Sequence, residues 1–138
     1  EAKSLGYQTY DLRIQKLFHY GNSLFDQKRF KECLHIQRKI LLIQPENARA
    51  LKNAAFLYLK FQRPITALKL LDKAIEDDQE FLEAKVLKAF SLASLRRFTS
   101  AAELLSEVMQ NSNTGFHKDY AQELQNSINQ YQKPFEKK

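Results

Sequence analysis

Apolar residues recur at spacings of three and four along most of the chain, in paired runs that a short polar stretch separates. In the first pair, Leu17 and Leu24 lie on one face of a predicted helix, and Phe30 and Ile40 on one face of the next. This spacing is that of amphipathic α-helices that bury one side. The pattern therefore predicts an all-α chain built from helical hairpins.

The pattern repeats every 34 residues, which indicates an array of similar units. Small or apolar residues share a phase in three columns: Gly21, Ala55 and Ala89; Cys33, Ala67 and Ala101; Ile40, Ala74 and Val108. A small residue at a helix crossing lets two axes approach to roughly 8–10 Å. We expect a leader with the start of the first helix at 1–13, repeats at 14–47, 48–81 and 82–115, a capping helix at 116–132 and a tail at 133–138.

Glycine and proline are scarce, and the prolines fall where the hairpin phase allows them. The 138 residues contain three of each, too few for a turn-rich all-β fold. Pro45 lies between two units and Pro64 begins a second helix, where its missing N–H carries no penalty. Both positions support the division into hairpins.

After the third unit, one apolar stripe continues along an otherwise polar segment. It consists of Tyr120, Leu124, Ile128 and Tyr131. The last hydrophobic face of a helical array meets water unless a further helix covers it. We therefore expect a capping helix here.

The repeat resembles the tetratricopeptide repeat family, whose 34-residue unit carries small residues at its helix crossings. The residues that match are Gly21, Cys33 and Pro45 in the first unit, Ala55, Tyr58, Ala67 and Ala74 in the second, and Ala89 and Ala101 in the third. The resemblance implies a superhelical array of three hairpins plus a cap. It also implies that the first helix of each hairpin lines a concave face where ligands of this family lie.

Carried onto this chain, the family's ligand-lining positions form an unusually apolar set. The predicted groove residues are Phe18, Asn22, Phe25, Lys52, Asn53, Phe56, Leu59, Val86, Leu87 and Phe90. Apolar surface of this extent marks an interaction site. We expect a protein or peptide segment with apolar anchors, either an amphipathic helix or an extended strand, with Asn22 and Asn53 bonding to its backbone.

One subfamily binds the C-terminal carboxylate of heat-shock chaperones through a clamp of Lys, Asn and Arg side chains. Asn22 and Asn53 match the asparagines of that clamp, but its cations are replaced by Phe18, Glu83 and Leu87. A carboxylate buried there would lack partners for its charge. We therefore do not expect the clamp in this chain.

The turn inside each predicted hairpin carries cations where the family has Gly and Asp. We call the set Lys28, Arg29, Lys60, Arg63, Arg96 and Arg97 the basic ridge. In the simplest interpretation these residues complement the negative ends of the first helices, each contributing about 0.3–1 kcal/mol. The alternative is that they bind an acidic partner, an anionic membrane or nucleic acid. The net charge of +6 fits either interpretation.

Sequence motifs for catalysis are missing, so we expect no enzyme activity, no cofactor and no metal. The chain has no GxxxxGK[ST], GxSxG or HExxH motif. Cys33 and His35 point about 200° apart on a helix and cannot share a proton, so Cys33 is predicted to be a buried spacer. A single cysteine indicates a reducing compartment, and we expect a cytoplasmic protein.

The sequence thus predicts a non-catalytic protein-interaction module, with three alternatives left open within that class. One is a small chaperone of the type III secretion class that holds a hydrophobic secretion substrate or needle subunit. Another is a fragment of a scaffold subunit in a larger assembly. In the third, the groove is covered by the chain itself, through Tyr7 and Tyr10, or by a second copy in a homodimer. We do not expect nucleic acid or a membrane surface as the partner.

Overall fold

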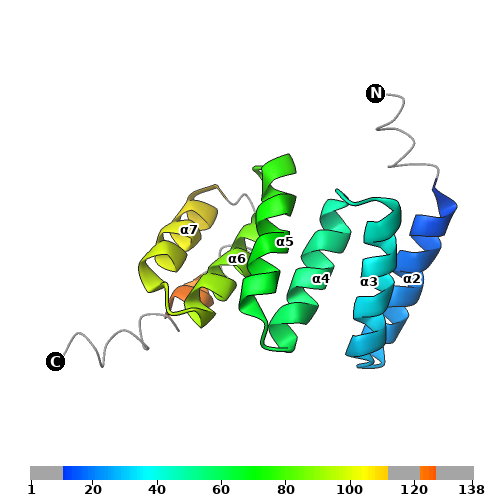
Figure 1. The fold of residues 1–138 in the computed structure, drawn as a ribbon. Helices are drawn as coiled ribbons and strands as arrows, with labels where there is room; N and C mark the ends of the chain where they lie inside the picture. The colour runs from blue at the N-terminus through cyan, green and yellow to red at the C-terminus, as the bar shows by residue number, and fades with distance from the viewer. Residues whose placement is uncertain (1–10, 112–121, 127–138) are drawn as a thin grey trace.

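The computed structural model describes residues 11–111 and 122–126, and these residues form antiparallel helical hairpins stacked side by side (Figure 1). The helices are α2 (Leu12–Asp26), α3 (Phe30–Ile43), α4 (Ala48–Lys60), α5 (Pro64–Asp77), α6 (Leu82–Ser94) and α7 (Phe98–Asn111). Each predicted repeat supplies one hairpin: α2 with α3, α4 with α5, and α6 with α7. The described residues contain no strand, and the predicted all-α array is confirmed.

The predicted capping helix lies only partly within the described residues. Residues 122–126 are helical, and Leu124 packs against the cluster of α6 and α7 that contains Ala89, Leu105 and Val108. The rest of 116–132 lies outside the described residues, as do residues 1–10 with Tyr7 and Tyr10, and the tail.

Three of the helices start with a side-chain cap or with proline. Asp11 caps α2 by accepting from the backbone N–H groups of Arg13 and Ile14. A side-chain hydrogen bond from Arg13 is the main reason that the pKa of Asp11 lies below its usual value. Asn47 caps α4 by accepting from Ala50 N–H at 3.0 Å, and Pro64 is the first residue of α5.

The three columns of the 34-residue repeat are all buried, and they lie where helices cross. In the first hairpin the Cys33 thiol donates to the Gly21 carbonyl oxygen at 3.3 Å. Ala55 with Ala67, and Ala89 with Ala101, occupy the same positions in the next hairpins, and all four have no exposed surface. The absence of large side chains at these crossings allows the close approach of the paired helices.

Ion pairs tie α6 to both of its neighbouring helices. The Lys85 ammonium lies 2.6 Å from a Glu107 carboxylate oxygen on α7, and its side chain is only 11% exposed. Lys88 lies 2.7 Å from a carboxylate oxygen of Asp72 on α5. Lys85 stands at a packed position of the third hairpin, and Glu107 provides the charge partner that makes its burial tolerable.

Phe18 belongs to the core rather than to an open groove surface, which corrects its predicted position. Its side chain is 7% exposed and packs in the cluster that contains Ile14, Ile36 and Ile40. The Arg49 guanidinium carbon lies 4.2 Å from the centre of the Phe18 ring and covers it from α4. This cation–π contact stabilises the packed ring by about a further 0.5–2 kcal/mol.

The turn inside each hairpin has one and the same backbone structure. In the first turn, Lys28 N–H donates to Phe25 O and Arg29 N–H donates to Leu24 O, both at 2.9 Å. This pair of bonds is a Schellman motif, which satisfies the last carbonyls of α2. The motif recurs in the turns between α4 and α5 and between α6 and α7.

The Schellman motif places one residue of each turn in the left-handed region, where glycine is normally found. Lys28, Gln62 and Arg96 occupy this position with φ of 61°, 60° and 62°. A residue with a Cβ pays roughly 1–2 kcal/mol for this conformation. Each of the three turns is therefore less stable than glycine would make it.

Replacing Lys28 by glycine should stabilise the fold. We expect Lys28→Gly to raise the free energy of unfolding by about 0.5–1 kcal/mol, because the strain it removes exceeds the added freedom of glycine in the unfolded chain. Lys39→Gly is the matched control, since it makes the same change within helix α3 and should destabilise by about 1 kcal/mol. Urea denaturation followed by circular dichroism measures both, and destabilisation by Lys28→Gly would contradict the assignment.

The burial of Phe18 predicts a loss of stability when its ring is removed. Phe18→Ala should lower the free energy of unfolding by about 3 kcal/mol, as a truncated core aromatic does. Tyr20→Ala on the same helix, where the ring is 52% exposed, should change it by no more than about 0.5 kcal/mol. Equal effects of the two substitutions in thermal unfolding would show that Phe18 is not part of the core.

Candidate functional site

A cavity of about 330 Å³ lies between the first helices of the three hairpins, α2, α4 and α6. These helices are the first helices of successive stacked hairpins and run in the same direction (Figure 1). The lining residues are Asn22, Phe25, Cys33, Gln37, Lys52, Asn53, Phe56, Leu57, Glu83, Val86 and Leu87.

Unequal helix spacing explains why the cavity forms on the side of α2. The backbones of α4 and α6 approach each other directly, whereas those of α2 and α4 do not. Between these helices, Cys33 and Gln37 of α3 line the cavity, although both are almost fully buried. The cavity is therefore lined by the first hairpin and by the first helices of the next two.

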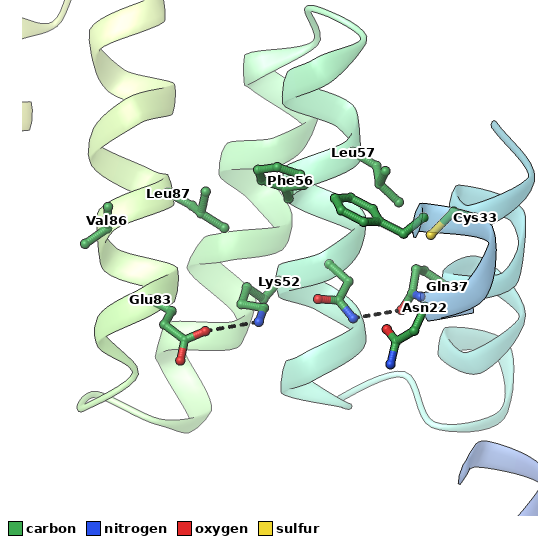
Figure 2. Close-up of a pocket in the computed structure, with 11 residues that line it drawn as sticks. Asn22, Cys33, Gln37, Lys52, Phe56, Leu57, Glu83, Val86 and Leu87 are labelled. Atoms are coloured by element: carbon green, nitrogen blue, oxygen red, sulfur yellow. Dashed lines mark hydrogen bonds and ion pairs between the residues drawn. The ribbon is translucent and has the colours of Figure 1, made fainter. Parts of the chain in front are cut away.

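One side of the cavity is apolar and is formed mainly by side chains of α4 and α6. Figure 2 shows Phe56 and Leu57 of α4 and Val86 and Leu87 of α6 along this side. The rings of Phe25 and Phe56 close it toward α2, with their centres 5.8 Å apart. A ligand placed here would bury aliphatic or aromatic groups.

Polar side chains from all four helices α2, α3, α4 and α6 form the other side. Lys52 of α4 and Glu83 of α6 form an ion pair at 3.1 Å, so neither charge faces the cavity alone (Figure 2). Asn53 donates to the Gln37 side-chain oxygen at 3.3 Å. The exposed Asn22 side chain makes no hydrogen bond to any other described residue and leaves an amide available to a ligand.

The structure brings seven of the ten predicted groove residues to this cavity: Asn22, Phe25, Lys52, Asn53, Phe56, Val86 and Leu87. The other three lie elsewhere. Phe18 is in the core, and Leu59 is half-buried against the cluster of Ala55, Ala67 and Leu71. Phe90 is 42% exposed, on the same helix as Leu87 but outside the cavity.

Two of the predicted groove residues, Lys52 and Val86, are less available to a ligand than the sequence predicted. Lys52 was predicted to line the groove, but its ammonium pairs with Glu83. Val86 was predicted to belong to an apolar groove surface, and it lines the cavity but is only 4% exposed.

The predicted groove set lacked four cavity residues, Cys33, Gln37, Leu57 and Glu83, and of these Gln37 is the buried polar one. It lies on the second helix of its hairpin, whereas the predicted set came only from first helices. The repeat contained a signal, since the equivalent positions are Leu71 and Leu105, both fully buried. An amide that replaces leucine at a 1% exposed position is costly to bury without hydrogen bonds. Gln37 meets this requirement with Asn53.

Gly21 makes room for this amide. A Cβ added to Gly21 would lie 2.8 Å from the Gln37 side-chain nitrogen, which is too close for contact. The missing side chain of Gly21 thus serves two purposes, the helix crossing and the position of the Gln37 amide beside the cavity.

Cys33 has the environment of a packing residue, as predicted. It is 3% exposed, and burial raises the pKa of its thiol. The thiolate is the nucleophilic form of cysteine, so a raised pKa leaves Cys33 unreactive at neutral pH. Among the described residues no group of His, Cys, Asp and Glu could hold a metal ion. None of the helices of residues 11–111 and 122–126 is both long and apolar enough to cross a membrane.

All six residues of the basic ridge lie at the hairpin turns, which share one edge of the array, the lower edge in Figure 1. Each of these six residues is exposed to solvent. Arg29 pairs with Glu32 of α3, and the Lys60 ammonium lies 4.7 Å from the ring centre of Phe30. Within the described part of the chain, Lys28, Arg63 and Arg97 form no ion pair.

Comparison with known proteins finds its matches among solved structures. No protein-family model matches the chain, and no curated protein sequence matches it. The TPR2B domain of yeast Sti1, in a structure described as a pHsp70 complex, has a TM-score of 0.80 and 22% identity over 88% of this chain and 99% of that one.

Two further solved structures have a similar fold, with lower sequence identity to this chain. The Sgt2 TPR domain of Aspergillus fumigatus has a TM-score of 0.79 and 16% identity, and covers 91% of this chain and 83% of its own. The first TPR of Spaghetti (RPAP3), bound to the HSP90 peptide SRMEEVD, has a TM-score of 0.74 and 18% identity over 86% of this chain and 91% of its own. The chain therefore has the fold of a tetratricopeptide repeat domain.

Proposed function

We propose that this chain is a protein-interaction module that binds an apolar segment of a partner protein in the cavity between α2, α4 and α6. The observation that carries the proposal is the arrangement of the cavity, with an apolar side at Phe56 and Leu87 and a polar side at Asn22 and Asn53. Peptide sites combine apolar pockets with a few polar groups that orient the backbone in this way.

The amides on the polar side suit the backbone of a bound segment. The Asn22 side chain offers both a donor and an acceptor, and the Asn53 oxygen is left to accept while its nitrogen bonds to Gln37. An extended segment has unpaired N–H and C=O groups that need such partners when water is removed. The partner's apolar side chains would then lie against Phe25, Phe56 and Leu87.

Structural neighbours support a peptide as the ligand, because the Spaghetti domain was solved with an HSP90 peptide and the Sti1 domain in a pHsp70 complex. This chain differs at the positions where that subfamily binds a terminal carboxylate. Glu83 pairs with Lys52, Leu87 is apolar, and Phe18 is buried. The affinity would therefore come from apolar anchors. A reducing, cytoplasmic compartment suits the unreactive thiol of Cys33.

The proposal predicts that groove substitutions weaken binding while substitutions of exposed apolar residues elsewhere do not. Peptides selected from a random display library on the immobilised chain provide the ligand, and fluorescence anisotropy gives its Kd. Phe56→Ser and Leu87→Ser should each raise Kd about tenfold or more, since burial of such a side chain contributes roughly 1.5–3 kcal/mol.

Leu42→Ser and Ile65→Ser are matched controls, because both residues are exposed, at 83% and 59%, and both lie outside the cavity. Their Kd should stay within about twofold of the unsubstituted chain. Circular dichroism confirms that each variant retains its helices. Unchanged binding by folded Phe56→Ser and Leu87→Ser chains would contradict the proposed site.

A further inference from the structure

The residues of the basic ridge are not those that the turns alone would favour, although the Arg29 side chain donates to Gln27 and Glu32 at the first turn. Lys28 and Arg96 hold the left-handed position of their Schellman motifs, where a Cβ is unfavourable. Arg29 and Arg63 hold the position before the first residue of α3 and α5 and make no side-chain capping bond. A guanidinium has no acceptor and cannot cap a helix N-terminus.

Helix dipoles explain the cations only in part. Lys60 lies in the last turn of α4 and complements the negative C-terminal end of that helix. The other ridge cations lie between the negative C-terminal end of one helix and the positive N-terminal end of the next, which offsets part of the attraction.

Charge is also separated between the two edges of the array. The turn between α5 and α6, at the edge opposite the hairpin turns (Figure 1), is rich in carboxylates. These are Glu76, Asp77, Asp78, Glu80 and Glu83. Asp26 and Glu32 flank the first hairpin turn, where Glu32 pairs with Arg29. In the described residues, Lys28, Arg63 and Arg97 form no ion pair. The ridge thus presents a positive surface to whatever lies beside it.

The ridge is continuous with the apolar side of the cavity. Phe25 lines the cavity, and its carbonyl oxygen accepts the Lys28 N–H of the first turn. Its ring packs edge-on against Phe30 with centres 5.3 Å apart. The Lys60 ammonium lies 4.7 Å from the ring centre of Phe30 and 5.4 Å from that of Phe56. A chain that leaves the cavity past Phe56 therefore reaches Lys60 and then the turns.

We propose that the partner segment bound in the cavity continues into a run of Asp or Glu residues that lies on the basic ridge. This inference rests on the proposed function and specifies its ligand as a protein segment with apolar anchors next to an acidic stretch. Carboxylates of such a stretch would pair with Lys28, Arg63 and Arg97. Their attraction would speed association and fix the direction of the segment.

The aromatic residues at this junction favour a protein segment over a nucleic acid. Single-stranded nucleic acids bind by stacking bases on open aromatic faces. Here Lys60 already covers a face of Phe30 and of Phe56, and Phe25 is packed against both rings. The junction is thus suited to aliphatic side chains followed by charge.

The test compares two sets of fluorescent synthetic peptides. Each has leucine and phenylalanine two residues apart, the spacing that places both on one face of an extended segment, followed or preceded by a run of glutamates in one set and of glutamines in the other. At low salt, the folded chain should bind the better glutamate peptide about tenfold more tightly than its glutamine counterpart, as three exposed ion pairs provide. Added salt should reduce this preference.

Two triple variants with the same change in charge separate the ridge from net charge. Lys28→Gln/Arg63→Gln/Arg97→Gln should lose the preference for glutamate, whereas Lys16→Gln/Lys39→Gln/Lys69→Gln, which changes exposed lysines on helices, should keep it. Equal loss in both variants would overturn the inference, because net charge alone would then account for the preference.

The remaining outcomes distinguish this inference from the proposed function. Equal affinity for glutamate and glutamine peptides, both weakened by Phe56→Ser, would overturn the acidic stretch and leave the groove in place. Binding of no peptide would overturn both. Tighter ridge-dependent binding of single-stranded DNA or of phosphatidylserine vesicles than of the glutamate peptide would overturn the assignment to a protein segment.

Discussion

The close approach of two helices at a small residue is the constraint on which the rest of this structure depends. In the first hairpin, Cys33 reaches the Gly21 carbonyl at 3.3 Å, and buried alanines occupy the same positions in the other hairpins. Without this approach, the helices of a hairpin would separate and the parallel first helices would not share one face. In the first hairpin the absence of a Cβ at Gly21 also admits the Gln37 amide, which bonds to Asn53 beside the cavity. The packing that builds the hairpin thereby positions the polar side of the candidate site.

Much of the fold could be predicted from the sequence because each hairpin depends on local periodicity and one repeated small residue. The 34-residue phase predicted the buried columns and the start of α5 at Pro64. Most groove residues could be placed as well, since they follow from their position on the first helix of each unit. The backbone of the turns could not, because cations at a left-handed position run against the usual preference for glycine.

The errors at the site come from contacts between residues far apart in the chain. Phe18 became a core residue because Arg49 of the next hairpin covers its ring. Lys52 forms an ion pair with Glu83, which lies 31 residues further along the chain. A helical pattern within one hairpin carries no information on such pairs. They arise when the hairpins stack, and they place Phe18 in the core and pair Lys52 with Glu83.

The central claim, that a protein segment binds between α2, α4 and α6, is tested most directly by nuclear magnetic resonance of the labelled chain during titration with a selected peptide. The side-chain amide signals of Asn22, Gln37 and Asn53 report on the polar side of the cavity, and backbone signals of Phe56 and Leu87 on its apolar side. The account predicts that these signals shift together and saturate at one equivalent of peptide. Saturable shifts confined to other surfaces, such as those around Leu42 and Ile65, would contradict it.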